Sequence, residues 1–92
     1  MAKQRTFGGI TGGVWSCVKT TSEQEHGTVY APPGANQGTA TTNTIVGEVI
    51  LSFDFDPAKE SVAYSITKKP FLASDNQIWD GIQETIDHCN GS

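Results

Sequence analysis

Apolar and polar residues alternate most clearly between Thr44 and Phe71, where two runs keep a period of two. Alternation of this kind predicts β-strands with one buried and one exposed face. The segment PAKE at 57–60 interrupts it with turn residues, so we predict two long antiparallel strands joined by a tight turn. The buried face of the first strand carries Ile45, Val49, Leu51, Phe53 and Phe55, and that of the second carries Val62, Tyr64 and Ile66.

The register of this hairpin follows from its turn. If residues 57–60 form a four-residue loop, Asp56 lies opposite Ser61. A slip of one residue would turn one apolar set to water, so this register is well specified. It pairs Phe55 with Val62, Phe53 with Tyr64 and Leu51 with Ile66 on the buried face, and Ile50 with Thr67 and Glu48 with Lys69 on the exposed face.

The sequence after Phe71 predicts a helix over residues 74–90. Ser74 and Gln77 form a capping box at its start, and Gly91 is a stop signal at its end. Its apolar residues fall within an arc of about 100° on a helix, opposite a polar face. They are Ile78, Trp79, Ile82, Ile86 and Cys89, and we expect this stripe to pack on the sheet over Phe53, Phe55, Tyr64 and Ile66.

The N-terminal third carries weaker signals. Residues 1–13 are rich in glycine and lack the helix start and Lys of a phosphate-binding loop, so we interpret them as a flexible arm or a bulged strand. Residues 14–20 alternate and predict a strand, with Trp15 and Cys17 on the core side. A polar turn over 21–27 and a short strand over 28–30 would complete a first hairpin.

Residues 31–43, APPGANQGTATTN, contain no side chain larger than Gln and are rich in Pro, Gly, Thr and Asn. That composition is typical of a surface loop, so we expect no core residue here. The length is near the limit for structureless loops in compact domains, which indicates either a mobile segment or a recognition loop.

Length and charge narrow the classes of function. The 92 residues suffice for one domain with one core, and 36% hydrophobic residues against 17% charged residues favour a folded chain. A net charge of -4 with scattered Lys and Arg argues against a nucleic-acid surface. No apolar run is long enough to span a membrane. As written, the chain is expected to be cytoplasmic, and exported if Met1 replaced a removed signal peptide.

Two cysteines, Cys17 and Cys89, both fall on predicted core faces and could meet. Two alternatives stay open: a disulfide in an oxidising compartment, or two buried thiols. Neither His88 beside Cys89 nor the acidic turn around Asp54 and Asp56 has the spacing of a metal site. We therefore expect no metal and no cofactor.

These elements predict a small α+β domain: an antiparallel sheet of three to five strands with one C-terminal amphipathic helix packed on one face. The order of elements is similar to that of helix-and-curved-sheet ligand binders, although 92 residues is short for enclosing a cavity.

The favoured function is a small non-catalytic interaction module that recognises a protein partner through the 31–43 loop. Its predicted binding residues are Tyr30, Asn36, Gln37, Thr39, Thr41 and Asn43. The alternative is a small-molecule binder that uses a groove between helix and sheet, lined by Trp15, Trp79, Tyr64 and Phe71. An enzyme is the third hypothesis and is not favoured, because no acid, base or nucleophile has an identifiable partner.

Overall fold

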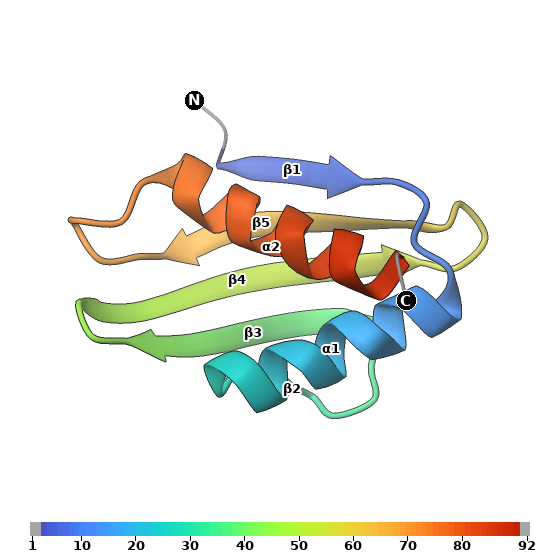
Figure 1. Cartoon of the computed structure of the whole chain (residues 1–92), viewed down its shortest axis with the longest axis horizontal. Coiled ribbons are helices and arrows are strands. Elements are labelled where there is room, and N and C mark those ends of the chain that lie inside the picture. The colour runs from blue at the N-terminus through green and yellow to red at the C-terminus, as the bar shows by residue number, and fades with distance from the viewer. Residues whose placement is uncertain (1–2, 91–92) are drawn as a thin grey trace.

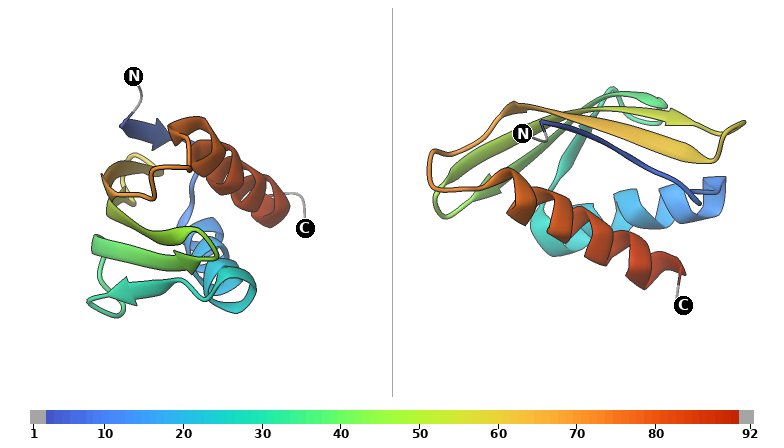
Figure 2. Two further views of the ribbon diagram at one scale, coloured as in Figure 1. Left: turned by 90° about the vertical axis from the view of Figure 1, so that its left-hand side faces the viewer. Right: turned by 90° about the horizontal axis from the view of Figure 1, so that it is seen from above.

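The computed structural model describes residues 3–90. Five strands form one antiparallel sheet in the order β1-β5-β4-β3-β2, and two helices lie on the same face of it (Figures 1 and 2). This two-layer arrangement confirms the predicted α+β class. The elements are β1 (Gln4–Phe7), α1 (Gly12–His26), β2 (Val29–Ala31), β3 (Gln37–Thr44), β4 (Gly47–Asp56), β5 (Ser61–Lys68) and α2 (Asp75–Asn90).

The hairpin of β4 and β5 has the predicted register at its turn. Asp56 lies opposite Ser61, Phe53 opposite Tyr64 and Leu51 opposite Ile66. A β-bulge between Ile50 and Leu51 then shifts the pairing by one residue. Ile50 consequently faces Lys68 rather than Thr67, and Lys68 rather than Lys69 forms the ion pair with Glu48, at 3.1 Å.

The first strand of the predicted hairpin begins later than expected. Ile45 was predicted to face the core, but Ile45 and Val46 form the turn between β3 and β4, and Ile45 is fully exposed. The Thr44 hydroxyl closes this turn by donating to the Gly47 carbonyl oxygen at 2.7 Å. Gly47 has φ 140°, a conformation that suits glycine and fixes the start of β4.

The prediction of a surface loop over 31–43 was wrong, because residues 37–44 form strand β3. Every residue of β3 pairs with β4, and alternating Thr side chains favour an extended backbone. Ala40 is buried against the helices, so this segment does contribute to the core. A Cβ at Gly38 would overlap the carbonyl oxygen of Ala31, which explains a glycine inside this strand.

Residues 14–20 form part of a helix rather than a strand. Residues 21–26, which were predicted to form a turn, belong to the same helix. Helix α1 begins after Thr11, whose hydroxyl accepts from the Val14 amide at 3.2 Å, and ends at Gly27 with φ 67°. Trp15 and Val18, three residues apart, face the core. The predicted first hairpin is therefore absent, and β2 pairs with β3 instead.

The glycine-rich N-terminal segment is not a flexible arm. Residues 4–7 form edge strand β1 against β5, and Phe7 and Ile10 are both buried. The Ile10 amide donates to the Glu60 carbonyl oxygen at 2.7 Å, so the connection to α1 is tied to the β4–β5 turn. The strand agrees with the other alternative, a bulged strand, and the segment supplies two core residues that were not predicted.

Helix α2 begins as predicted. The Gln77 amide donates to the Ser74 hydroxyl at 3.2 Å, and the Gln77 side chain accepts from the Ser74 amide at 3.0 Å. The predicted stop at Gly91 lies outside the described residues. Neither helix in residues 3–90 meets the length and hydropathy that a membrane crossing requires. Of the predicted stripe, Trp79, Ile86 and Cys89 are buried, and Ile78 and Ile82 are partly buried.

The two helices divide the sheet between them. Trp15 of α1 stacks on Phe55 with 5.4 Å between ring centroids and also contacts Phe53, so these two rings lie under α1 rather than under α2. Trp79 of α2 contacts Phe7 on edge strand β1, at 6.4 Å. Each helix is thus anchored by one tryptophan on a different part of the sheet.

The facing of β4 is tested by a pair of alanine substitutions. Phe53 is 4% exposed and contacts Trp15 and Tyr30, so Phe53→Ala is expected to lower the free energy of unfolding by about 3–5 kcal/mol. Its neighbour Ser52 faces away from the helices, and Ser52→Ala should change it by less than about 0.5 kcal/mol. Urea unfolding measures both, and equal losses would reject this facing.

Candidate functional site

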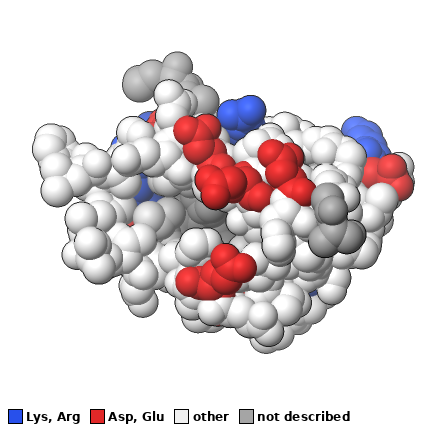
Figure 3. Space-filling view, viewed as in Figure 1, with Lys and Arg blue, Asp and Glu red and all other residues white. Residues whose placement is uncertain are grey.

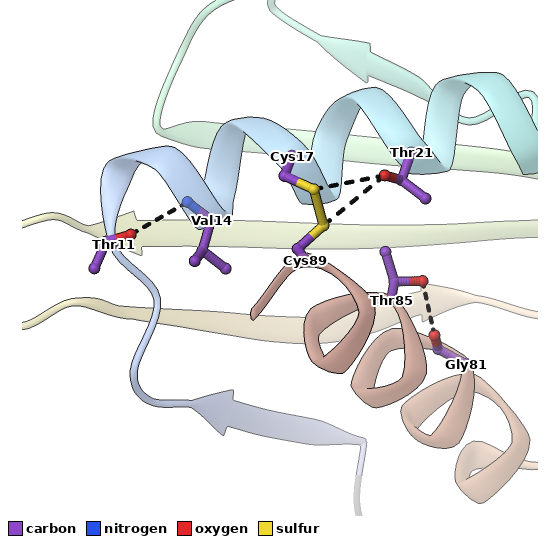
Figure 4. The surroundings of a disulfide bond; sticks show 7 residues. All are labelled: Thr11, Val14, Cys17, Thr21, Gly81, Thr85 and Cys89. Carbon is purple, nitrogen blue, oxygen red and sulfur yellow. Dashed lines mark hydrogen bonds between the residues drawn. A yellow bond between two sulfur atoms is a disulfide. The ribbon is translucent and has the colours of Figure 1, made fainter. Parts of the chain in front are cut away.

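A disulfide joins the two helices near one end. Cys17 of α1 and Cys89 in the last turn of α2 are bonded, with 5.8 Å between their Cα atoms (Figure 4). The Thr21 hydroxyl lies 3.8 Å from each sulfur atom. The structure thus has the disulfide, one of the two alternatives that the sequence left open.

The helices diverge away from this disulfide. In Figure 1 the first turns of α2 and the last turns of α1 lie far apart over the sheet. An open cavity of about 250 Å³ lies between them. We call it the interhelical cavity. Its apolar lining comes from both helices and from four of the five strands: Val18 of α1, Tyr30 of β2, Ala40 of β3, Val49 and Leu51 of β4, Tyr64 of β5, and Ile78 and Ile82 of α2.

Polar groups lie on both sides of the interhelical cavity, with Gln77 and Thr85 on α2 and four more on the side formed by α1, β2 and β3. Ser22 and His26 come from the end of α1, and the hydroxyls of Thr28 and Thr42 are hydrogen-bonded to each other at 2.7 Å. Thr28 is buried. Hydroxyl groups of this kind can exchange partners and accept or donate to a ligand without changing charge.

Two tyrosines line the interhelical cavity, and both remain protonated at neutral pH. Burial raises the pKa of Tyr64 well above its ordinary value. Burial also raises the pKa of Tyr30, and the Glu23 carboxylate adds to this rise, while a hydrogen bond with Ser22 opposes it. The site therefore offers two neutral phenols beside the threonine hydroxyls.

Gly81 lies in the middle of α2, at the edge of the interhelical cavity. Glycine in a helix interior is about 1 kcal/mol less favourable than alanine. A Cβ at Gly81 would meet no atom within 4 Å, so close packing does not explain the glycine. Gly81 also lines a second groove between α1 and α2, and its missing side chain leaves this part of the space between the helices open.

Acidic residues surround this opening. The second groove includes Glu25 of α1 and Glu84 of α2, together with His26 and His88. Figure 3 shows acidic side chains over both helices, on either side of the opening. No three His, Cys, Asp or Glu residues within 3–90 are grouped so as to hold a metal ion. The surroundings of the opening thus carry negative charge.

The predicted binding residues do not form one loop. Asn36 lies in the connection between β2 and β3, whereas Gln37, Thr39, Thr41 and Asn43 lie on β3 and alternate with buried Ala40. These four residues therefore form a row on the outer face of the sheet, away from the helices. Tyr30 pairs with Ala40 and faces the helices, so the sheet separates it from that row. That they bind a partner stays a prediction.

Of the aromatic residues predicted to line a groove, only Tyr64 lines the interhelical cavity. Trp15 and Trp79 are buried in the core, and Phe71 is 99% exposed in the connection between β5 and α2. The aliphatic lining from α1, Val18, was not predicted because residues 14–20 were expected to form a strand. The isolated glycine within the predicted helix 74–90 was the signal that could have pointed to the opening.

Comparisons with models of known protein families, with curated proteins and with solved structures found no match to this chain. Its function is therefore argued from the geometry of this fold.

Two glycine substitutions test the opening at Gly81. Gly81→Ala is expected to raise the free energy of unfolding by about 0.5–1 kcal/mol, because the added methyl meets open space in a helix. Gly38→Ala, where the methyl would overlap the Ala31 carbonyl, should lower it by more than about 1 kcal/mol. Denaturant unfolding measures both. A destabilising Gly81→Ala would mean that the helices are packed closely there.

Removing the disulfide should destabilise the whole domain. The bridge spans 72 residues, and the chain-entropy model gives about 4 kcal/mol for a loop of this length. The double variant Cys17→Ala, Cys89→Ala is expected to lose about that much in urea unfolding. Adding a reductant to the wild type should reproduce the loss, and the same reductant should leave the double variant unchanged. Equal stability of all forms would contradict a structural role for the bridge.

Proposed function

We propose that this protein binds a small, largely apolar molecule, neutral or positively charged, in the interhelical cavity. The observation that carries this proposal is an open space of about 250 Å³ over the sheet of a chain of only 92 residues. Protein interiors are close-packed, and a domain of this size has little core to spare. A space lined mainly by apolar residues of both helices and the sheet is therefore the feature of the fold that calls for a function.

The volume of the interhelical cavity limits the size of the ligand. An apolar cavity of ~150 Å³ holds a benzene molecule, and typical ligand pockets begin at ~300 Å³. About 250 Å³ therefore suits one substituted ring or a short branched chain. The apolar contacts would come from Val18, Leu51 and Ile82, which reach the cavity from both helices and the sheet.

Polar groups in the interhelical cavity set the orientation of the ligand. A hydroxyl or amide of the ligand can replace the hydrogen bond between Thr28 and Thr42, or accept from the protonated Tyr30 phenol. The apolar end would then lie against Ile78 and Ile82 of α2, while Gln77 and Thr85 of the same helix offer further polar contacts. A few convergent polar groups in an apolar pocket are typical of small-molecule sites.

Charge at the opening selects among ligands of equal size. Glu25 and Glu84 lie beside the entrance, and the chain as a whole carries a net charge of -4. A carboxylate ligand would approach against this field, while an amine would approach with it. The proposal therefore excludes fatty acids and other organic anions as the preferred class.

Recognition of a protein partner is the second candidate, and one observation favours it. Gln37, Thr39 and Thr41 form a row on the outer face of the sheet, which neither helix covers. This row offers hydrogen-bonding side chains but no large apolar anchor of the kind that dominates binding energy in interfaces. The cavity therefore supports the better proposal.

Three probes that share one ring test the small-molecule proposal: neutral p-cresol, cationic tyramine and anionic 4-hydroxyphenylacetate. Titrations followed by amide NMR shifts should show binding of the first two, centred on residues around Ala40, Leu51 and Ile82. The anion should bind at least about tenfold more weakly, because the opening is acidic.

Gly81→Leu supplies the matching structural test, since a leucine there would occupy the opening. It should weaken p-cresol binding at least about tenfold, whereas Thr20→Leu, which adds the same side chain on the exposed face of α1, should leave binding unchanged. Undiminished binding to Gly81→Leu, or shifts confined to residues outside the cavity, would overturn the proposed function.

A further inference from the structure

Two loops at the end of the sheet opposite the disulfide expose large apolar side chains. Ile45 is 105% exposed, Phe71 99% and Leu72 75%, and Val46 is 49% exposed. Ile45 and Val46 form the β3–β4 turn, and Phe71 and Leu72 lie between β5 and α2. We call these four residues the apolar tips. Both loops extend at the left-hand end of the molecule in Figure 1.

The apolar tips belong to ordered loops that lie side by side. A Cβ at Gly47 would come within 3.0 Å of the Pro70 ring, so the two loops touch at their bases. The first is closed by the Thr44 hydroxyl, as described above. The second is held by Lys69, whose ammonium lies 3.3 Å from Asp75 and donates to the Ala73 carbonyl oxygen at 2.7 Å. The exposed positions of these side chains are thus fixed by the loops that carry them.

The apolar tips contribute little to the folded core. Single exposed apolar residues are ordinary, but four on adjacent loop ends mark an interaction site. Figure 3 shows two separate projections at this end, with a hollow between them, rather than one flat surface. Two narrow projections suit a fluid layer that closes around each of them better than a rigid protein surface, which needs a continuous complementary face.

Charge around the apolar tips differs from the rest of the molecule. Lys68 and Lys69 precede the Phe71 loop, and Lys3 is placed beside them by a hydrogen bond of 2.8 Å from the Ile66 amide to its carbonyl oxygen. Glu48 and Asp75 are the acidic residues in the same segments, and each is paired with a lysine. The remaining eight acidic residues lie in other parts of the chain. The two acidic residues of these segments are thus each neutralised by a lysine, and Lys3 adds one further positive charge at this end.

We propose that the apolar tips insert into the interfacial layer of an anionic lipid bilayer. Phe71, Leu72 and Ile45 would enter the boundary between headgroups and acyl chains, where apolar burial drives binding. Lys3 and Lys68 would face the lipid phosphates, and exposed ion pairs such as Lys68–Glu48 are weak enough to be exchanged for them. The acidic helices would point away from the surface, which fixes the orientation of the molecule.

Cosedimentation with phospholipid vesicles tests this proposal. The wild type is expected to bind vesicles that contain phosphatidylserine several-fold more tightly than vesicles of phosphatidylcholine alone, and added salt should reduce the difference. The triple variant Ile45→Ser, Phe71→Ser, Leu72→Ser should lose at least about tenfold in vesicle affinity at an unchanged melting temperature, because all three side chains are exposed.

Val29→Ser is the matched control, since Val29 is also an exposed apolar residue, at 63%, but lies on edge strand β2. It should bind vesicles as the wild type does. Equal vesicle binding by the triple variant, or no binding of the wild type to either vesicle, would overturn the proposal. So would gel filtration that finds a dimeric wild type and a monomeric triple variant without vesicle binding, because the tips would then contact a second copy.

Discussion

The structure depends on how two helices share one face of a five-stranded sheet while a single covalent bond joins them near one end. Trp15 fixes α1 over β4 and Trp79 fixes α2 beside β1, so the helices are anchored on different parts of the sheet. The Cys17–Cys89 bridge joins the two helices near one end of the sheet. Because the helices are joined at that end, they can diverge at the other, and the interhelical cavity lies between their diverging parts.

Side-chain size along the sheet follows the same division. Large rings crowd the region around Trp15, where Phe53, Phe55 and Tyr64 all contact it. Between the diverging ends of the helices, the sheet presents Ala40 and Val49, and α2 presents Gly81. Aromatic packing is therefore concentrated around Trp15, and the site lies beside it, where Ala40, Val49 and Gly81 leave space between the larger side chains. An open site in this region lowers the stability of the fold little, because the tryptophan contacts that hold the helices to the sheet lie elsewhere.

The elements that could be predicted from the sequence are those marked by several short-range signals at once. The β4–β5 register followed from a four-residue turn and two alternating faces, and the capping box of α2 from Ser74 and Gln77. Helix α1 was missed because seven residues with Trp15, Cys17 and Lys19 on one side fit a period of two almost as well as a helix. Strand β3 was missed because its side chains are small, and its extended form depends on pairing with β4, a contact that composition does not reveal.

The candidate site was predictable only in outline. A groove between helix and sheet was one of the sequence hypotheses, but its lining required a second helix that the sequence had not indicated. Aromatic residues were assigned to the groove for their size, yet Trp15 and Trp79 are what hold the helices to the sheet. The exposed position of Phe71 could not be foreseen either, because it depends on where the β3–β4 turn and the start of α2 place their loops.

The diverging helices leave an apolar space open above the sheet, and the proposed binding site depends on this space. A crystal structure determined under xenon pressure tests it most directly, because xenon occupies apolar cavities of this size without requiring a particular ligand. We expect xenon density between Val18, Leu51 and Ile82. Helices packed together over Ala40 and Val49, with their side chains filling the space and no xenon there, would contradict it.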